Sequence, residues 1–283
     1  MAAIAYITDA KLLEYHRLNQ VHEMNFWRLN TNINFSDFKK GDLLFFLSKD
    51  KEHQRKKEKG IVGLGRCISM HQASIDTMWK NYGHKNGYTS LKSFKEAIVK
   101  VTKDNELPKK ISSIYLEDVI FFQDPIYLSD LGKQVSRSME SYIYIDNDDE
   151  LLSIKLLESA KDDIDIWSSE DYDRLVIEKE EIRTVLYHVH DRYRLHYPSS
   201  KILRKMLMEE MQKDTELEYI LDSKYEAYKI VDDKLYIVMC PLIMKDDLMV
   251  KRVMLGQEAL YRKAFDALYP YNLHIIFKVL EKR

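Results

Sequence analysis

A strongly patterned stretch, Phe38 to Arg66, constrains the fold more than any other part of the chain. It contains two apolar runs, Leu43 to Leu47 and Ile61 to Leu64, on either side of the highly charged segment Lys49 to Lys59. Short apolar runs bounded by turn residues are typical of buried strands, and so charged a segment cannot enter a core. The stretch predicts a β-hairpin with a solvated tip. The glycines of its second strand predict a bulge, or a close approach by another backbone or a ligand.

The residues of this hairpin, GDLLFFLSKD followed by GIVGLGR, resemble the central hairpin of the PUA-like superfamily and, within it, of EVE-type domains. The later stretch ISSIYLEDVIFFQDPIYLSDLG resembles the end of such domains, so the resemblance covers residues 1 to about 145. EVE-type domains are small β-barrel-like folds that hold a flipped, often modified, base in an aromatic pocket. Many are attached to nucleases or other enzymes of bacterial phage defence. The resemblance therefore implies an N-terminal PUA-like β-barrel with helices that binds nucleic acid.

Length and charge suggest how the chain is divided. Its 283 residues fit two domains of ordinary size. From Asp146 the chain becomes crowded with acid, whereas residues 1 to 145 hold about 22 Lys and Arg against about 17 Asp and Glu. We expect a mixed α+β protein with a PUA-like (EVE-type) nucleic-acid-binding domain at 1–146 and an α/β domain at 147–283. Ordinary scatter of surface charge would explain the same asymmetry, and that alternative stays open.

Two aromatic segments are candidates for a base pocket. In NFWRLNTNINF, Trp27 is suited to stack a base, and Asn32 or Asn30 to read a base edge. A contact between a base and an aromatic ring contributes about 1–3 kcal/mol. The loop around Gly83 and Gly87 also combines aromatic, amide and basic side chains. The predicted base-binding residues are Trp27, Asn32, Trp79, Tyr82, Asn86 and Tyr88. Core packing of the aromatic rings, and turn or cap roles for the polar residues, would explain the same pattern.

Cations near these segments are candidates for contacts with phosphate, which dominate the affinity of most nucleic-acid-binding proteins. They lie on the second hairpin strand, in the aromatic loop and at the hairpin tip. The predicted phosphate-binding residues are Arg66, Lys85, Arg55, Lys56 and Lys57.

The C-terminal end predicts a strand, a turn, a second strand, a helix and a final strand. This order is similar to the second half of PD-(D/E)xK nucleases, and Gln257 and Tyr261 have the Q-x-x-x-Y spacing of the RecB-like group. Such nucleases hold Mg²⁺ with carboxylates and use a Lys on the second strand, whereas this chain has Met239 and Pro241 there. The resemblance therefore implies a degenerate nuclease-like domain or a dimerisation module. The remaining catalytic candidates are Glu226, Asp233, Gln257 and Tyr261.

Histidines and cysteines give no clear metal site. His188 and His190 alternate beside Asp191, but the neighbouring Arg192 and Arg194 would repel a cation. The two cysteines, Cys67 and Cys240, are predicted to be buried free thiols of a reducing compartment. The chain shows no signal peptide and no apolar run of the roughly 20 residues that a membrane span needs, so a cytoplasmic protein is expected.

These observations favour a nucleic-acid-binding protein that reads a modified or flipped base, with DNA as the favoured partner, in bacterial restriction or phage defence. One alternative is an active, modification-dependent restriction endonuclease of PD-(D/E)xK type, which would use Mg²⁺; no other cofactor is indicated. Another is a protein-interaction scaffold that binds no nucleic acid. A homodimer is compatible with each of these hypotheses.

Overall fold

Two compact units make up the protein, residues 1–177 (unit 1) and 178–283 (unit 2). The computed structural model describes residues 3–29, 35, 37–102, 104–135, 139, 141–147, 149, 151–161, 170–232, 234–242, 247–269 and 271–281. The division lies later in the chain than the 146/147 boundary suggested by the shift in charge. The reason is that helix α4 (Leu152–Ala160) contributes Leu152, Leu156 and Leu157 to the core of unit 1.

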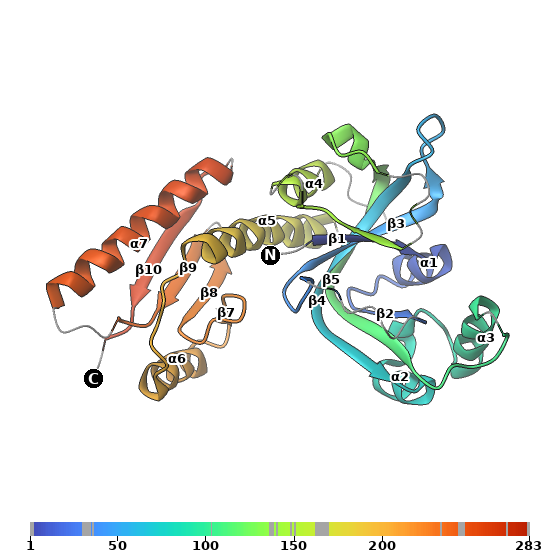
Figure 1. Ribbon diagram of the computed structural model, residues 1–283, viewed down its shortest axis with the longest axis horizontal. Helices are drawn as coiled ribbons and strands as arrows, with labels where there is room; N and C mark the ends of the chain where they lie inside the picture. The colour runs from blue at the N-terminus through green and yellow to red at the C-terminus, as the bar shows by residue number, and fades with distance from the viewer. Residues whose placement is uncertain are drawn as a thin grey trace. The chain divides into compact units, whose positions relative to one another are not determined.

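Unit 1 is built on a mixed six-stranded sheet with the strand order β2-β5-β4-β3-β1-β6 (Figure 1). Strands β1 and β3 are parallel, and all other neighbours in this order are antiparallel. The strands are β1 (Ala3–Thr8), β2 (Met24–Arg28), β3 (Leu43–Glu52), β4 (Lys59–Ala73), β5 (Ile111–Ile126) and β6 (Tyr142–Tyr144). The predicted hairpin is confirmed as β3–β4, with Leu43 opposite Arg66 and an exposed tip after Glu52.

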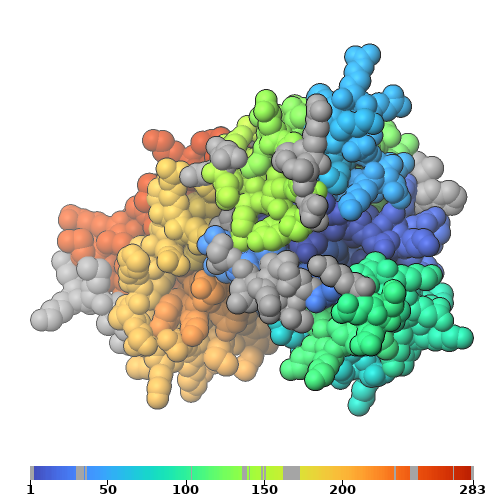
Figure 2. Space-filling view, turned by 45° about the vertical axis from the view of Figure 1, so that its right-hand side comes forward, coloured from blue at the N-terminus to red at the C-terminus, as the bar shows by residue number. Residues whose placement is uncertain are grey.

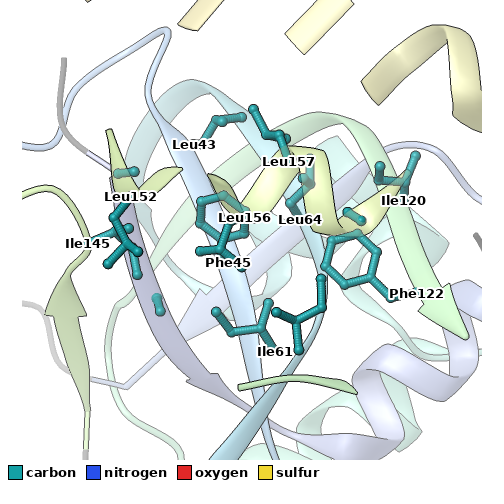
Figure 3. Close-up of a cluster of buried hydrophobic side chains, with 14 of the residues drawn as sticks. Leu43, Phe45, Ile61, Leu64, Ile120, Phe122, Ile145, Leu152, Leu156 and Leu157 are labelled. Atoms are coloured by element: carbon teal, nitrogen blue, oxygen red, sulfur yellow. The ribbon is translucent and has the colours of Figure 1, made fainter. Parts of the chain in front are cut away.

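Both faces of the central strands are buried, which explains why the first apolar run of the hairpin is continuous. Leu43, Phe45 and Leu47 belong to one apolar cluster, whereas Leu44 and Phe46 belong to another. Successive side chains of a strand point to opposite faces, so a strand covered on both sides needs apolar residues throughout. In Figure 3 the side chains of the first cluster converge from strands of the sheet and from helix α4.

Gly63 shows why the second strand of the hairpin is rich in glycine. A Cβ atom at this position would lie 2.4 Å from the carbonyl oxygen of Ile120 on β5. The pairing of β4 with β5 shifts register between Ile61 and Gly63. The predicted bulge and close backbone approach are therefore both confirmed, with a strand and not a ligand as the neighbour.

Helices of unit 1 begin where the sequence places capping residues. Asp9 caps α1 (Ala10–Leu18), Ser74 caps α2 (Ile75–Tyr82) and Ser90 caps α3 (Leu91–Val101). The short 3₁₀ helix η1 (Gly83–Asn86) joins α2 to α3, and η2 (Leu128–Leu131) follows β5. The segment α2–η1–α3 lies in sequence between β4 and β5 and encloses a small apolar cluster of its own.

Unit 2 contains a four-stranded sheet with the order β10-β9-β8-β7. Strands β8 and β9 form an antiparallel hairpin, and helix α7 connects β9 to the parallel strand β10. The elements are α5 (Glu170–Tyr193), which carries the boundary between the units, α6 (Lys201–Lys213), β7 (Glu218–Tyr219), β8 (Glu226–Val231), β9 (Lys234–Met239), α7 (Asp247–Leu268) and β10 (His274–Val279). The predicted element order and the mixed α+β class are confirmed.

Two further predictions can be compared with the structure. Cys67 and Cys240 are buried free thiols, as predicted. Within the described ranges, every helix is too short or too polar to span a membrane.

Candidate functional site

Three of the predicted base-binding aromatic residues form the small core under α2 and α3. The ring centroids of Trp27, Trp79 and Tyr88 lie 5.6, 6.1 and 5.5 Å from that of the fully buried Phe94. Aromatic pairs at these distances stabilise a core beyond the area they bury. Since each of these rings already packs against Phe94, and Trp27 also lies 6.3 Å from Tyr88, the geometry favours the core alternative for all three residues.

Asn86 has a structural role in the same cluster. Its side chain is fully buried, and its Nδ2 donates hydrogen bonds to the carbonyl oxygens of Gly83, at 2.8 Å, and Met78, at 3.4 Å. Its Oδ1 accepts a hydrogen bond of 2.8 Å from Nδ2 of Asn25. The amide therefore holds η1 against α2 and β2 and does not face solvent. The other amide candidate, Asn32, and its alternative Asn30 lie outside the described residues.

Tyr82, in contrast, lies at the surface, stacked on a residue that the sequence analysis did not identify. Its ring centroid is 5.2 Å from that of Tyr115, with 28° between the planes, and both side chains are half-buried. Tyr82 is the last residue of α2, and Tyr115 lies opposite Ser69 in the β4–β5 pairing. The imidazole of His71, which is exposed on β4, lies 6.2 Å from the Tyr82 ring.

Lys85 brings a positive charge to this stacked pair. Its Nζ donates a hydrogen bond of 2.8 Å to the Tyr115 hydroxyl, lies 5.3 Å from the centroid of that ring, and pairs with the Glu23 carboxylate. Burial raises the pKa of the Tyr82 and Tyr115 hydroxyls, so both phenols are neutral at physiological pH. Tyr82, Tyr115, Lys85 and His71 together are called the Tyr82–Tyr115 face below.

The other predicted phosphate contacts are placed differently. Arg66 is buried, and its Nη1 donates a hydrogen bond to the carbonyl oxygen of Gly41, so its side chain does not face solvent and its contact with phosphate stays a prediction. At the tip, Lys56 pairs with Asp130 at 2.5 Å and Lys57 with Glu52 at 3.8 Å, whereas the Arg55 side chain is exposed. The tip projects at the opposite end of unit 1 from α2 in Figures 1 and 2. These residues therefore do not share a site with Tyr82.

In unit 2, three of the four predicted catalytic residues are buried near one another. Glu226 begins β8, and its Oε2 lies 3.2 Å from Nδ1 of His190 on α5. The Tyr261 hydroxyl, from α7, lies 3.1 Å from the same ring nitrogen. Gln257, one turn earlier on α7, donates a hydrogen bond of 2.6 Å to the carbonyl oxygen of Tyr193. Asp233 lies outside the described residues.

A cavity of about 230 Å³ reaches this cluster from the surface of unit 2. His190 and Glu226 are its buried members. The exposed ones include Arg194, His196, Asp222 and Lys224. Burial raises the pKa of Glu226 to about 7, although Ser223, Tyr197 and Arg194 act in the opposite direction. A carboxyl group with such a pKa exchanges its proton near neutral pH, which is the range that acid–base chemistry uses.

The described part of this cluster, which does not include Asp233, offers Glu226 as its one carboxylate. Among the described residues, no three His, Cys, Asp or Glu side chains lie close enough together to hold a metal ion. Glu226 faces an imidazole and two phenols where a metal site would need further carboxylates. The role of His190 could not be predicted from the sequence, since the alternation of His188 and His190 gives only a weak metal pattern.

Comparisons with known proteins found similarity to solved structures. No family model matches the chain, and no curated protein matches it. Similar solved structures include ASCH from Zymomonas mobilis and two of its point mutants. They are 12% identical to this chain, with TM-scores of 0.38 to 0.39, and the match covers 54–55% of this chain and 94–96% of theirs. At this identity and TM-score the likeness does not assign the chain to a family.

Proposed function

We propose that unit 1 binds nucleic acid and that the Tyr82–Tyr115 face receives an unpaired or flipped base. The observation that supports this proposal is the half-exposed stack of two neutral phenol rings beside a lysine. Stacked aromatic side chains next to a cation are the feature with which proteins bind unpaired bases without reading their sequence. Trp27, Trp79 and Tyr88 support the face from below, because their packing around Phe94 holds α2 in place.

Charge around the face limits how much phosphate binding can contribute. Lys85 is already paired with Glu23, whose carboxylate would repel a phosphate group. A phosphate can be bound there only if Lys85 turns away from that carboxylate. We therefore expect stacking, at about 1–3 kcal/mol for each base, to contribute more than the single lysine. The salt dependence of binding should accordingly be shallow for this face.

Three finer parts of the proposal are supported by the sequence resemblance alone: a preference for a modified base, a preference for DNA over RNA, and a role in bacterial restriction or phage defence. A flipped base would cost a few kcal/mol to unstack, least for a base that is mismatched or single-stranded. Single strands should therefore bind unit 1 at least as well as intact duplexes.

Fluorescence anisotropy with labelled oligonucleotides tests the proposal. The panel contains single strands and duplexes of DNA and RNA, with cytosine unmodified, 5-methylated, 5-hydroxymethylated or glucosylated, at two salt concentrations. Tyr82→Ala should weaken binding by about 5- to 150-fold, the equivalent of about 1–3 kcal/mol. Tyr82→Phe keeps the ring and should retain the affinity.

Tyr271→Ala is the matched control, since it removes an exposed tyrosine of unit 2. It should bind like the unchanged protein. Equal affinities for all three variants would contradict a role for the face. Absence of any binding would favour the interaction-scaffold alternative.

A further inference from the structure

The cavity of unit 2 combines a buried acid–base pair with a cationic rim. Glu226 and His190 are 1% and 2% exposed, and the Glu226 carboxyl faces the His190 ring at 3.2 Å. The exposed residues around them carry two permanent positive charges, Arg194 and Lys224, against one negative charge, Asp222. We infer that this cavity is a binding site for a tetrahedral oxyanion, the phosphate group of an ester or a free anion, and that binding is coupled to the uptake of a proton.

Size and composition favour such a ligand over larger or cationic ones. Pockets for drug-sized ligands measure about 300–1,000 Å³ and are mostly apolar, whereas this cavity holds about 230 Å³ and is lined mainly by polar side chains. Arg194 lies close enough to Glu226 to influence its ionisation, so a cation would meet a positive charge at the entrance. Among the described residues, the cavity offers no set of three metal ligands. The guanidinium of Arg194 and the ammonium of Lys224 are the groups with which proteins hold phosphate.

Proton uptake follows from the position of Glu226 in the cavity. Its carboxyl is surrounded by His190 on α5, Tyr261 on α7, the Tyr197 hydroxyl and the Cys240 thiol. An anion is repelled by an ionised carboxylate but can accept a hydrogen bond from a protonated one. The pKa of about 7 means that both forms are populated at neutral pH. Because the anion favours the protonated form, its affinity must fall as the pH rises through about 7.

This inference does not depend on nucleic-acid binding by unit 1. The oxyanion can come from the end of a nucleic acid or from a small molecule, and both share the same tetrahedral chemistry. The two sources are distinguished by comparing a 5′-phosphorylated dinucleotide with its unphosphorylated form. Preference for the phosphorylated dinucleotide over sulfate identifies a nucleic-acid end, and the reverse order identifies a small anion.

Calorimetric titration of the full chain with sulfate is the test, because sulfate stays a dianion between pH 6 and 8. Chloride maintains constant ionic strength. The affinity should fall about tenfold from pH 6 to pH 8, which is the change in the protonated fraction of a group with a pKa of about 7. Glu226→Gln replaces the carboxyl by a permanently neutral donor, so its affinity for sulfate should fall less between pH 6 and pH 8 than that of the unchanged protein.

Substitutions at the exposed rim distinguish binding in this cavity from a general attraction of anions to exposed cations. Arg194→Ala and Lys224→Ala should each weaken sulfate binding by about tenfold, the loss of one charged hydrogen bond. Arg252→Ala and Lys263→Ala remove exposed cations of α7 that are not among the cavity residues and should change nothing. Tyr82→Ala should also leave sulfate binding unchanged. Absence of sulfate binding, an affinity independent of pH, or equal losses in the rim and control variants would overturn the inference.

Discussion

Two pairs of tyrosines, one in each unit, place their side chains in opposite ways. In unit 1, Tyr82 and Tyr115 stack at the surface and leave part of their rings exposed. In unit 2, Tyr228 and Tyr261 are buried, and their hydroxyls hydrogen-bond to Glu218 at 3.0 Å and to His190 at 3.1 Å. The rings of Tyr82 and Tyr115 are therefore available to stack on a partner, whereas the hydroxyls of Tyr228 and Tyr261 hold other polar groups in position.

This difference shows that the surrounding elements determine whether the ring or the hydroxyl of a tyrosine is available for contacts. A tyrosine combines an apolar ring with one polar group, and either part can face solvent. In unit 1 the strand pairing of β5 and the end of α2 bring two rings together at the surface. In unit 2, α5 and α7 enclose the hydroxyl of Tyr261 beside a buried carboxyl. Substitutions should test this difference through changes in stability. We expect these changes to decrease from the backbone at Gly63 to the Glu226 carboxyl, then to the tyrosine hydroxyls and finally to Lys85.

The largest effect is expected at the backbone that carries the unit 1 face. Gly63→Ala would place a Cβ atom against the carbonyl oxygen of Ile120, and overpacking of this kind costs about 1–3 kcal/mol. Gly256→Ala on α7 of unit 2 meets no atom within 4 Å and should stabilise the protein by about 0.5–1 kcal/mol. Urea unfolding of both variants measures these changes. Equal midpoints would contradict the close approach of β4 and β5.

The second-largest effect is expected in the pH dependence of stability, which Glu226 should dominate near neutral pH. Its pKa rises from an ordinary value of 4.5 to about 7 on folding, so the folded state binds the proton more tightly. The corresponding stability is fully present below about pH 4.5 and is lost as the pH rises to about 7. Glu226→Gln should flatten the free energy of unfolding across this window, as measured by urea denaturation at intervals of half a pH unit.

Asp146 of unit 1 provides a matched comparison for Glu226. Burial raises its pKa from 3.8 to about 6, and its carboxylate accepts a hydrogen bond of 2.8 Å from the backbone N–H of Ser153. The pKa shift has the same direction as that of Glu226, so this stability is also lost as the pH rises. Asp146→Asn should therefore flatten the pH dependence of the free energy of unfolding between about pH 3.8 and 6. The dependence near pH 7, which comes from Glu226, should remain. If a substitution at either residue removes the pH dependence of stability in both pH ranges, the two carboxyls do not titrate independently.

Removal of single hydroxyl groups should give smaller effects that differ between the units. Tyr261→Phe removes one buried hydrogen bond, and Tyr228→Phe removes two, to Tyr187 and to Glu218; each lost bond should destabilise unit 2 by about 0.5–1.5 kcal/mol. Tyr82→Phe changes a half-exposed residue and should stay within about 0.5 kcal/mol. Thermal unfolding compares the three variants. A large loss for Tyr82→Phe would mean that its hydroxyl, and not its ring, stabilises the face.

The smallest effect is expected for Lys85→Ala. The Lys85 side chain is 38% exposed and that of Glu23 41%, and ion pairs in such positions contribute about 0.2–1 kcal/mol. The difference from the unchanged protein should shrink when urea unfolding is repeated in 1 M salt, which screens exposed charges. A difference that persists at high salt would instead indicate packing of the lysine on the Tyr115 ring.

Local patterns in the sequence predicted much of the fold. The β3–β4 hairpin followed from its apolar runs, and α1, α2 and α3 each begin directly after a residue of a type that commonly caps helices. The burial of Arg66 could not be predicted, because its strand position turns the side chain toward the loop at Gly41. A sequence pattern describes which residues alternate along a strand, but it does not show which loop covers them.

Contacts between distant residues could not be predicted. The stacking of Tyr82 on Tyr115 depends on the register of β5 against β4, which no local pattern fixes. The cluster of His190, Glu226 and Tyr261 joins three elements that are far apart in the chain. Gln257 and Tyr261 were identified from their spacing alone, and the structure adds the imidazole between Tyr261 and Glu226.

Photo-crosslinking tests the central claim, base stacking at the Tyr82–Tyr115 face, most directly. A single-stranded oligonucleotide containing 5-iodouracil is irradiated in complex with the full chain, and the crosslinked peptide is identified by mass spectrometry. We predict a crosslink to the peptide that contains Tyr82 or to the one that contains Tyr115, and its loss in Tyr82→Ala. Crosslinks confined to the β3–β4 tip or to unit 2 would contradict the account.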